Sequence, residues 1–537
     1  MSILQLDYGS GAAVEQKPNI VYILADDLGY GDVACLNPLR GRIPTPHLDG
    51  LAKEGMVFTD AHASSSVCTP SRYGILTGRY NWRSRLQHGI VLPYEEPLLA
   101  PDRLTVAGLL SQHGYHTACI GKWHLGWNWP ITDAQRFAAH ALARFDQSPA
   151  AYATDAHQAA WRDIFSQPIA GGPTARGFQY YFGVDVPNWP PYCWIENDRS
   201  IGIPSELLPA ELLEGFQASL QGPAMATWNL LDLLPTLIDR SCRYITQQAS
   251  AREPFFLYLA LTSPHTPLAV HDEWRGKSGL NLYADFVMET DAMIGQVLRA
   301  LETASVADNT LVIVASDNGC ARYIGVSELE SKGHYPSAQF RGYKSDIWDG
   351  GHRIPFITRW PKVIRSESTC EQLVCLTDLM ATCAEIQGVT RPVNAAEDSV
   401  SLLPLLRGSQ APVRDHVVSH SLDGKFAIRD QNWKLVLCAG SGGWSKKDAD
   451  AGREGLPPVQ LYDLASDPGE TTNVCIQNQQ RIRKMVDMLN EIVASGRSTS
   501  CVTFGNDVAV DIWKLENESG TAARIRDDYD PQLARDS

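Results

Sequence analysis

Four short apolar runs, each followed at once by chemically reactive side chains, constrain the fold of this chain more than any other feature. The runs span residues 20–25, 116–120, 255–262 and 311–316 and are rich in β-branched and aromatic residues. Each is too short for a typical helix, so the pattern predicts buried strands of a mostly parallel sheet. Between them, apolar residues recur at helical spacing in 46–54 and 284–301. We therefore expect an α/β fold with a large central sheet flanked by helices.

Polar side chains follow each of the four runs at the point where the run ends. In open α/β sheets ligands bind beyond the carboxyl ends of the strands, so these segments should deliver their polar residues to one crevice. Turn formation alone explains an Asp or Asn after a strand, but it does not require Lys and His at the same places. The expected cluster contains Asp26, Asp27, Lys122, His124, His265, Asp317 and Asn318.

The remaining sequence pattern divides the chain into two domains. We place an α/β domain at 18–400, with a Trp- and Pro-rich insertion at about 127–209 that lies over the crevice. A smaller α+β domain is expected at 401–537. Short strands near 426–429, 433–438 and 459–464 predict an antiparallel sheet, and an apolar stripe in 477–495 predicts a helix on it.

Composition excludes several classes of partner and site. The chain has 537 residues, 46 Lys and Arg against 61 Asp and Glu, and a net charge of −15, which would repel nucleic acid and anionic lipid. The 12 cysteines form no CxxC pair, so neither a disulfide scaffold nor a zinc cluster is expected. No apolar segment is long enough to span a bilayer. The sequence given starts without a recognisable signal peptide, and it leaves the compartment and the oligomeric state undetermined.

One cysteine stands in an informative context. Cys68-Thr69-Pro70-Ser71-Arg72 is followed by Tyr73-Gly74-Ile75-Leu76-Thr77-Gly78-Arg79. Pro70 suits the first turn of a helix, because its missing N–H costs nothing there. Residue 68 would then lie at the helix N-terminus, where free backbone donors and the helix dipole favour anionic oxygen. The structural alternative is a buried cysteine before a helix-starting proline.

This run resembles the signature of the type I sulfatases. Further matches to that family follow in order: 18–32, 121–126, 262–267, 316–319, 342–344, 350–355 and 461–470. The resemblance covers about residues 18–475 and implies the alkaline-phosphatase-like sulfatase fold. A small departure is Asp349, where Glu is commoner in the family. Family members are often periplasmic or secreted, so the resemblance implies such a location.

The resemblance also implies a reaction and a role for each residue of the cluster. Cys68 would be oxidised by a formylglycine-generating enzyme, and the hydrated aldehyde would take the sulfuryl group from a sulfate ester. Arg72 and Lys122 would hold the diol, and His124 would remove a proton so that sulfate leaves. His265 and Lys344 would stabilise the sulfate and protonate the departing alcohol oxygen.

The family binds one calcium ion with residues that match Asp26, Asp27, Asp317 and Asn318. These four side chains supply only oxygen, which suits a hard cation and argues against zinc. A solvated turn is the structural alternative for two adjacent acids after a strand.

The expected substrate is a sulfated carbohydrate, either an oligosaccharide or a polysaccharide. Aromatic and polar residues of the insertion suit stacking on sugar rings, although they also suit core packing; they are Trp127, Trp129, Asn188, Tyr192, Trp194 and Glu196. The candidate substrate-binding residues are Trp123, Trp189, His88, Arg176, His271 and Arg341.

Two other functions remain open from sequence. A formylglycine phosphonate or phosphate ester hydrolase would share the fold and the nucleophile. A catalytically inactive sugar-binding relative should have lost at least one catalytic residue, and Cys68, Arg72, Lys122, His124, His265 and Lys344 are all present. A two-zinc phosphatase is disfavoured, because it would need further His and Asp ligands.

Overall fold

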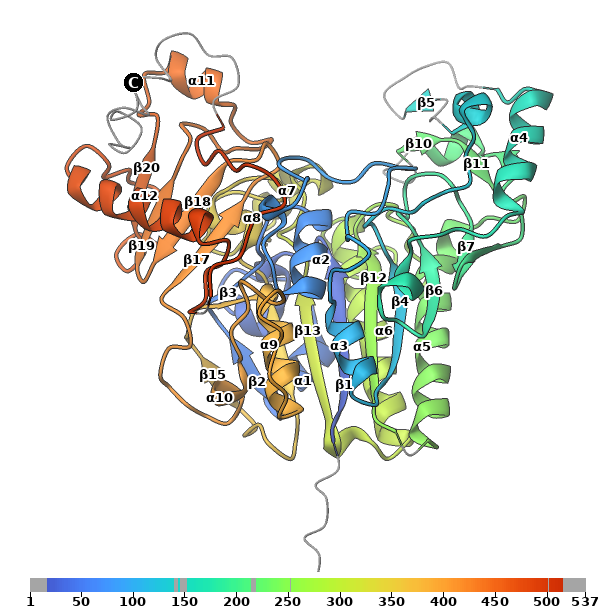
Figure 1. Cartoon of the computed structure of the whole chain (residues 1–537), viewed down its shortest axis with the longest axis horizontal. Coiled ribbons are helices and arrows are strands. Elements are labelled where there is room, and N and C mark those ends of the chain that lie inside the picture. The colour runs from blue at the N-terminus through green and yellow to red at the C-terminus, as the bar shows by residue number, and fades with distance from the viewer. Residues whose placement is uncertain are drawn as a thin grey trace, which may run out of the picture.

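A ten-stranded sheet forms the centre of the molecule (Figure 1). The structure is a computed structural model that describes residues 17–139, 143–144, 152–213, 219–251, 253–500 and 502–514. The strands lie in the order β15 (Ser368–Cys370), β2 (Met56–Phe58), β14 (Phe356–Arg359), β13 (Thr310–Ser316), β1 (Asn19–Asp26), β12 (Phe255–Pro264), β4 (His116–Lys122), β6 (Tyr180–Val184), β7 (Trp194–Glu196) and β8 (Arg199–Ile201).

The four strands predicted from the apolar runs are neighbours in this sheet. They are β13, β1, β12 and β4, and each adjacent pair is parallel. Ile20 pairs with Phe256 on one side and with Leu311 on the other, so the strands begin together. Their carboxyl ends therefore meet at one edge of the sheet, as predicted. Antiparallel pairing begins only beyond this group, at β14 and at β7.

Helices cover both faces of the sheet (Figure 1). Alternate residues of β1 enter the two cores: Ile20, Tyr22 and Leu24 pack on one face, and Val21, Ile23 and Ala25 on the other. The first face is covered by α2 (Cys68–Thr77), α3 (Val106–Gln112), α9 (Leu379–Ile386) and α10 (Leu403–Leu406). The second is covered by α1 (Pro46–Glu54), α5 (Leu233–Ala249), α6 (Leu282–Thr303) and α7 (Val326–Ser331). The predicted α/β architecture is confirmed.

A smaller antiparallel sheet forms the C-terminal part of the described chain. Its strands are β17 (His416–His420), β18 (Phe426–Asp430), β19 (Trp433–Val436) and β20 (Gln460–Asp463). Helix α12 (Gln479–Ala494) packs Ile482, Met485 and Leu489 against this sheet, as its apolar stripe predicted. Helices α8 (Asp349–His352) and α11 (Asp448–Arg453) are short. The predicted second domain, 401–537, extends outside the described residues at 501 and 515–537.

The segment at 127–209 is more than an insertion. It contains β6, which pairs in parallel with β4, and then β7 and β8, so it extends the central sheet. It also contains α4 (Asp155–Phe165) and β9 (Glu206–Leu207), which pairs with β11 (Pro223–Ala224). Two further short pairs join β3 (Ala61–His62) to β16 (Val374–Cys375) and β5 (Ala143–Arg144) to β10 (Leu220–Gln221). Residues 140–142 and 145–151 of this segment lie outside the described residues.

The described helices include none that combines the length and the apolar character needed to cross a bilayer.

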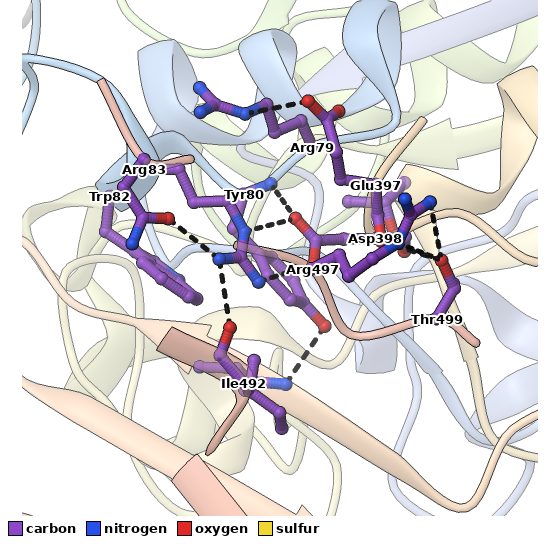
Figure 2. Close-up of polar contacts among 12 residues, drawn as sticks. Arg79, Tyr80, Trp82, Arg83, Glu397, Asp398, Ile492, Arg497 and Thr499 are labelled. Carbon is purple, nitrogen blue, oxygen red and sulfur yellow. Dashed lines mark hydrogen bonds and ion pairs between the residues drawn. The ribbon is translucent and has the colours of Figure 1, made fainter. Parts of the chain in front are cut away.

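A buried ionic cluster connects the segment just after helix α2 with residues 397–398 and with helix α12 (Figure 2). Arg83 forms two hydrogen bonds of 2.8 Å with the carboxylate of Asp398 and donates another, of 3.1 Å, to the carbonyl of Ile492 in α12. Arg79, the last residue of the cysteine-containing run, lies 3.3 Å from Glu397 and 3.0 Å from Asp507. Arg79 therefore fixes the end of α2 to the C-terminal segment.

We predict that Asp398→Asn lowers the free energy of unfolding by about 3–5 kcal/mol, because it leaves the buried Arg83 guanidinium without its carboxylate. The matched control is Asp239→Asn, which removes an exposed ion pair with Arg243 of 2.9 Å within α5. That change should cost less than about 0.5 kcal/mol. Urea denaturation followed by circular dichroism measures both. Equal unfolding midpoints for the two variants would contradict the structural role of this cluster.

Candidate active site

The carboxyl ends of β4 and β12 meet the N-terminus of α2 at a cavity of about 580 Å³, and the ends of β1 and β13 reach this cluster through the pairs Lys122–Asp26 and Arg72–Asp317. Reactive side chains from distant parts of the sequence line it: Cys68, Lys122, His124, His265 and Lys344. All five are buried, with exposed fractions of 7% or less. Of the residues expected in one crevice, Lys122, His124 and His265 line this cavity. The other four, Asp26, Asp27, Asp317 and Asn318, do not line it but form hydrogen bonds with Lys122, Lys344, Arg72 and one another.

Cys68 is the first residue of α2, and the local sequence explains why the helix begins there. Val67 is extended, at φ −144° and ψ 156°, and Pro70 lies in the first turn. The helix ends at Gly78, whose φ of 62° is the left-handed conformation that favours glycine. Burial raises the pKa of the Cys68 thiol, although Lys122 and Lys344 act to lower it. An unmodified Cys68 would therefore stay a neutral thiol.

Three cations pair with three carboxylates near Cys68. Lys122 Nζ donates to Asp26 Oδ2 at 2.8 Å. Arg72 Nε donates to Asp317 Oδ2 at 3.0 Å, and its Nη2 lies 2.8 Å from the same oxygen. Lys344 Nζ donates to Asp27 Oδ2 at 2.7 Å. Arg72 Nη2 also lies 3.5 Å from Asp26 Oδ1, so Asp26 and Asp317 share this guanidinium. Each carboxylate thus has at least one cation beside it, which offsets the cost of burying the charges.

The two aspartates that share Arg72 have opposite pKa shifts. Burial acts to raise the pKa of Asp26, but Lys122 and the other cations around it hold that pKa well below its usual range. Burial and the negative charge of Asp26 raise the pKa of Asp317 to about 6. The carboxylates therefore repel one another even with their cations present, and an additional positive charge would relieve this repulsion.

The oxygens in this cluster fit a metal ion. Asp26 Oδ1 and Asn318 Oδ1 are buried and form no hydrogen bond within the part of the chain that the structure describes. Asn318 Nδ2 donates to Asp27 Oδ1 at 2.7 Å, which leaves its carbonyl oxygen available. One ligand atom each from Asp26, Asp27 and His265 lies within 4.8 Å of the others. Carboxylate and amide oxygens are ligands of hard cations, and buried polar atoms of this kind normally have a partner.

His124 is held as a neutral base. It adopts a left-handed conformation, at φ 54°, and its Nε2 lies 3.0 Å from the carbonyl oxygen of Val91. Because that carbonyl can only accept, Nε2 carries the proton and Nδ1 keeps its lone pair. Burial and the positive charges of Lys122 and Arg72 lower the pKa of His124 well below its usual value. The imidazole also contacts the edge of Trp189, with ring centroids 5.8 Å apart.

His265 is oriented in a similar way. Its Nδ1 lies 2.6 Å from the carbonyl oxygen of Thr266, and its Nε2 lies 3.6 Å from Asp27 Oδ2. Burial and the positive charge of Lys344 lower its pKa to about 4. Lys344 itself keeps its proton, because Asp27 raises its pKa well above the usual value against the opposing effect of burial.

Among the six candidate substrate-binding residues, Trp189 lines the cavity and the other five do not. Trp123 is 1% exposed and packs against Trp127 and Phe178 in the core, so it offers no face to a ligand. His88 is exposed but is not a lining residue.

The remaining three candidates are engaged elsewhere. Arg176 donates twice to the carbonyl oxygen of Leu99, at 3.1 and 2.8 Å. His271 Nδ1 lies 2.6 Å from the carboxylate of Glu289. Arg341 donates to the carbonyl oxygen of Glu470 at 2.9 Å and lies over the ring of Trp348. These side chains support the fold and do not extend into the cavity.

The other residues singled out in 127–209 divide between core and cavity. Asn188 lines the cavity. Trp127, Trp129 and Tyr192 are buried, and Trp194 stacks on Phe182 with centroids 5.0 Å apart. Glu196 pairs with Arg240 at 3.1 Å. Their aromatic composition reflects core packing.

Two aromatic residues that line the cavity, Tyr323 and Trp444, were not predicted from the sequence. Tyr323 follows shortly after Asn318, and Trp444 lies in the turn sequence Ser441-Gly442-Gly443-Trp444 of the smaller domain. A tryptophan beside two glycines in a loop is a signal for an exposed aromatic ring, but nothing in the sequence places that loop beside Lys344.

Comparison with known proteins identifies the family. The sulfatase family model matches residues 18–389, and the model for the C-terminal region of N-sulphoglucosamine sulphohydrolase matches residues 343–498. The N-acetylgalactosamine-6-O-sulfatase of Bacteroides thetaiotaomicron is 31% identical over 91% of this chain and 95% of its own length. Human arylsulfatase A is 29% identical over 94% of this chain and 92% of its own.

A solved structure also matches the fold of this chain. It comes from work on the metabolism of multiple glycosaminoglycans by Bacteroides thetaiotaomicron, and it superimposes with a TM-score of 0.75 at 28% identity. The alignment covers 89% of this chain and 99% of that one. The match extends over both domains. Membership of one family therefore explains the sequence signature, the central sheet and the cluster of charged residues around Cys68. The chain belongs to the sulfatase family, and it is a sulfuric ester hydrolase.

Proposed function

We propose that this enzyme removes sulfate from a sulfated sugar, using a formylglycine formed from Cys68 and one bound calcium ion. One observation carries the proposal. Two lysines and two histidines line the cavity around residue 68, and the lysines and Arg72 form hydrogen bonds with three buried carboxylates. The sugar is favoured because a relative aligned over most of both chains is an N-acetylgalactosamine-6-O-sulfatase.

Formation of formylglycine requires a maturation enzyme, which is the partner that we propose for this chain. A raised thiol pKa makes Cys68 itself a weak nucleophile at neutral pH. The hydrated aldehyde that replaces it supplies a hydroxyl oxygen to attack sulfur and, when the aldehyde reforms, releases inorganic sulfate.

The cations of the cavity hold the sulfate ester for this attack. Lys122 and Lys344 line the cavity, and their Nζ atoms donate hydrogen bonds to Asp26 and Asp27. Each ammonium has further N–H groups that can donate to sulfate oxygens. Arg72 lies deeper, against Asp317 and the Lys122 carbonyl, and positions both. These donors are fixed before substrate binds, so they stabilise developing negative charge without reorganisation.

His265 is the better proton donor of the two groups expected to protonate the departing alcohol oxygen. Its low pKa makes the protonated imidazole a strong acid, and a sulfate anion bound beside it favours that protonated form. Lys344 holds its proton too tightly for this step and instead supplies charge.

His124 performs the opposite transfer when sulfate leaves. Its Nδ1 is buried, has no hydrogen-bond partner among the described residues and keeps its lone pair, because Nε2 donates to Val91. We propose that this nitrogen accepts the proton that must leave the second hydroxyl of residue 68 as the aldehyde reforms. Its lowered pKa keeps the imidazole neutral and ready between turnovers.

Calcium is the metal that we propose for the oxygen cluster. Asp26, Asp27, Asp317 and Asn318 would hold it, and it would supply positive charge beside the sulfate oxygens. Asp26 Oδ1 and Asn318 Oδ1 accept no hydrogen bond within the described residues, which supports this assignment, although Arg72 Nη2 lies 3.5 Å from Asp26 Oδ1.

The two alternative functions are less well supported. The relatives named above are sulfatases, which favours sulfate esters over phosphonate or phosphate esters. An inactive sugar-binding protein would not need the paired charges that are retained around residue 68.

We predict that coexpression with a formylglycine-generating enzyme replaces the Cys68 thiol by an aldehyde, which mass spectrometry of the tryptic peptide detects. Cys68→Ala should lower sulfate release from an aryl sulfate by at least about a thousandfold, as expected for loss of a nucleophile. Cys35→Ala, at an exposed cysteine, is the control and should keep full activity. Active enzyme with an unmodified Cys68 would refute the mechanism.

We predict that calcium raises the thermal unfolding midpoint of the enzyme after removal of metal with a chelator. At a concentration 100 times its dissociation constant the ion would stabilise the fold by about 2.7 kcal/mol. Asp317→Asn should abolish most of this calcium-dependent increase, whereas Asp239→Asn should retain it. Differential scanning fluorimetry with and without calcium gives the comparison. The same increase in both variants would exclude Asp317 as a ligand.

A further inference from the structure

The cavity has an aromatic border that the mechanism does not use. Tyr323 and Trp444 both line it, with exposed fractions of 37% and 43%. Their ring centroids are 6.0 Å apart and the rings are tilted by 48°. Leu92, another lining residue, is 51% exposed. Large apolar side chains with this exposure mark the part of the cavity that opens to solvent.

The loop that carries Trp444 is attached to the residues that follow Lys344. The backbone N–H of Trp444 donates to Ser345 Oγ at 3.0 Å, and that of Ser445 donates to Asp346 Oδ1 at 3.1 Å. The N–H of Ile347 donates in turn to the carbonyl oxygen of Ser441 at 2.7 Å. Trp444 is therefore positioned relative to Lys344 by hydrogen bonds to the backbone of its loop, although it belongs to the smaller domain.

The cations of the cavity are already committed to the reacting sulfate. Among the lining residues within the described ranges, the lysines are Lys122 and Lys344, which bind Asp26 and Asp27, and the histidines are His124 and His265. The other lining residues are mainly apolar, and they include Ile90, Pro93, Val186 and Leu422. Among the described lining residues, the aromatic border of the cavity therefore has no positively charged side chain that could pair with a carboxylate or a second sulfate on the substrate.

We propose that Tyr323 and Trp444 form a platform for the ring of the leaving group, and that the enzyme selects singly sulfated rings without a second anionic group. The proposal rests on the sulfatase function proposed for this cavity and specifies its substrate class. A sugar or aryl ring has an apolar face that can lie on an aromatic side chain. A second anion would lose water against mainly apolar side chains without gaining a cation among the described lining residues, which costs free energy.

Binding to the Cys68→Ala protein tests the platform without hydrolysis. The ligands for calorimetry are 4-nitrophenyl sulfate, N-acetylgalactosamine 6-sulfate, and the disaccharide in which glucuronate is attached to the same sulfated sugar. The first two distinguish an aryl ring from a neutral sugar ring. We expect each of them to bind at least about tenfold more tightly than the uronate ligand, a difference of about 1.4 kcal/mol.

Variants of the platform complete the test. In the same background, Trp444→Ala and Tyr323→Ala should each weaken binding of the singly charged ligands by about tenfold, and Trp444→Phe should retain most of the affinity. Tyr152→Ala, at a residue that is 80% exposed and does not line the cavity, is the control and should change nothing. Leu92→Lys should selectively improve binding of the uronate ligand.

Each outcome decides the proposal. It is overturned if the uronate ligand binds as tightly as the neutral sugar, if Trp444→Ala behaves like the Tyr152→Ala control, or if none of the ligands binds at millimolar concentration. Sulfate release by the unmutated, matured enzyme is measured separately. If the ligands bind in the expected pattern but the matured enzyme releases no sulfate, the proposed function is refuted and the platform is not. If the enzyme releases sulfate but the binding pattern is absent, the platform is refuted and the proposed function is not.

Discussion

Burial of three carboxylates and three cations at one edge of the sheet is the constraint on which the active site depends. Taking a charge out of water costs several kcal/mol unless a partner is held at hydrogen-bonding distance. Lys122, Arg72 and Lys344 meet this condition at 2.7–3.0 Å, each with a different aspartate. The partners come from strand ends, a loop and helix α2, which are far apart in the sequence, so the pairs form only when the parallel strands are in register.

This ionic arrangement also determines the chemistry. Lys344 remains charged because it faces Asp27, whereas His124 and His265 remain neutral because they are buried beside Lys122 and Lys344. The cavity thus contains fixed positive charge and two groups able to exchange protons. Arg72 follows Cys68 within α2, so the helix that presents residue 68 also supplies part of the charge balance.

The sequence was sufficient to predict the sheet and the cluster because buried parallel strands have continuous apolar runs and because their polar residues follow immediately. It was insufficient where one residue type has two roles. Trp123 and Trp189 both precede or follow glycine- and proline-rich segments, but Trp123 packs in the core and Trp189 lines the cavity. Arg176 and Arg341 bind backbone carbonyls, which no sequence pattern indicates. Strand β6 was missed because its short run lies within a Trp-rich segment, and Trp444 was missed because its loop comes from the second domain.

Attack on sulfur by an oxygen of residue 68 is the step on which the proposed reaction depends. Incubation of the Cys68→Ser variant with an aryl sulfate, followed by mass spectrometry of the peptide that contains residue 68, tests this step directly. A serine has one hydroxyl that can attack sulfur, but it lacks the second hydroxyl through which the aldehyde reforms and sulfate leaves. The peptide should therefore gain one sulfuryl group as one equivalent of alcohol is released. Repeated release of free sulfate by this variant, with the peptide unmodified, would show that another oxygen attacks sulfur.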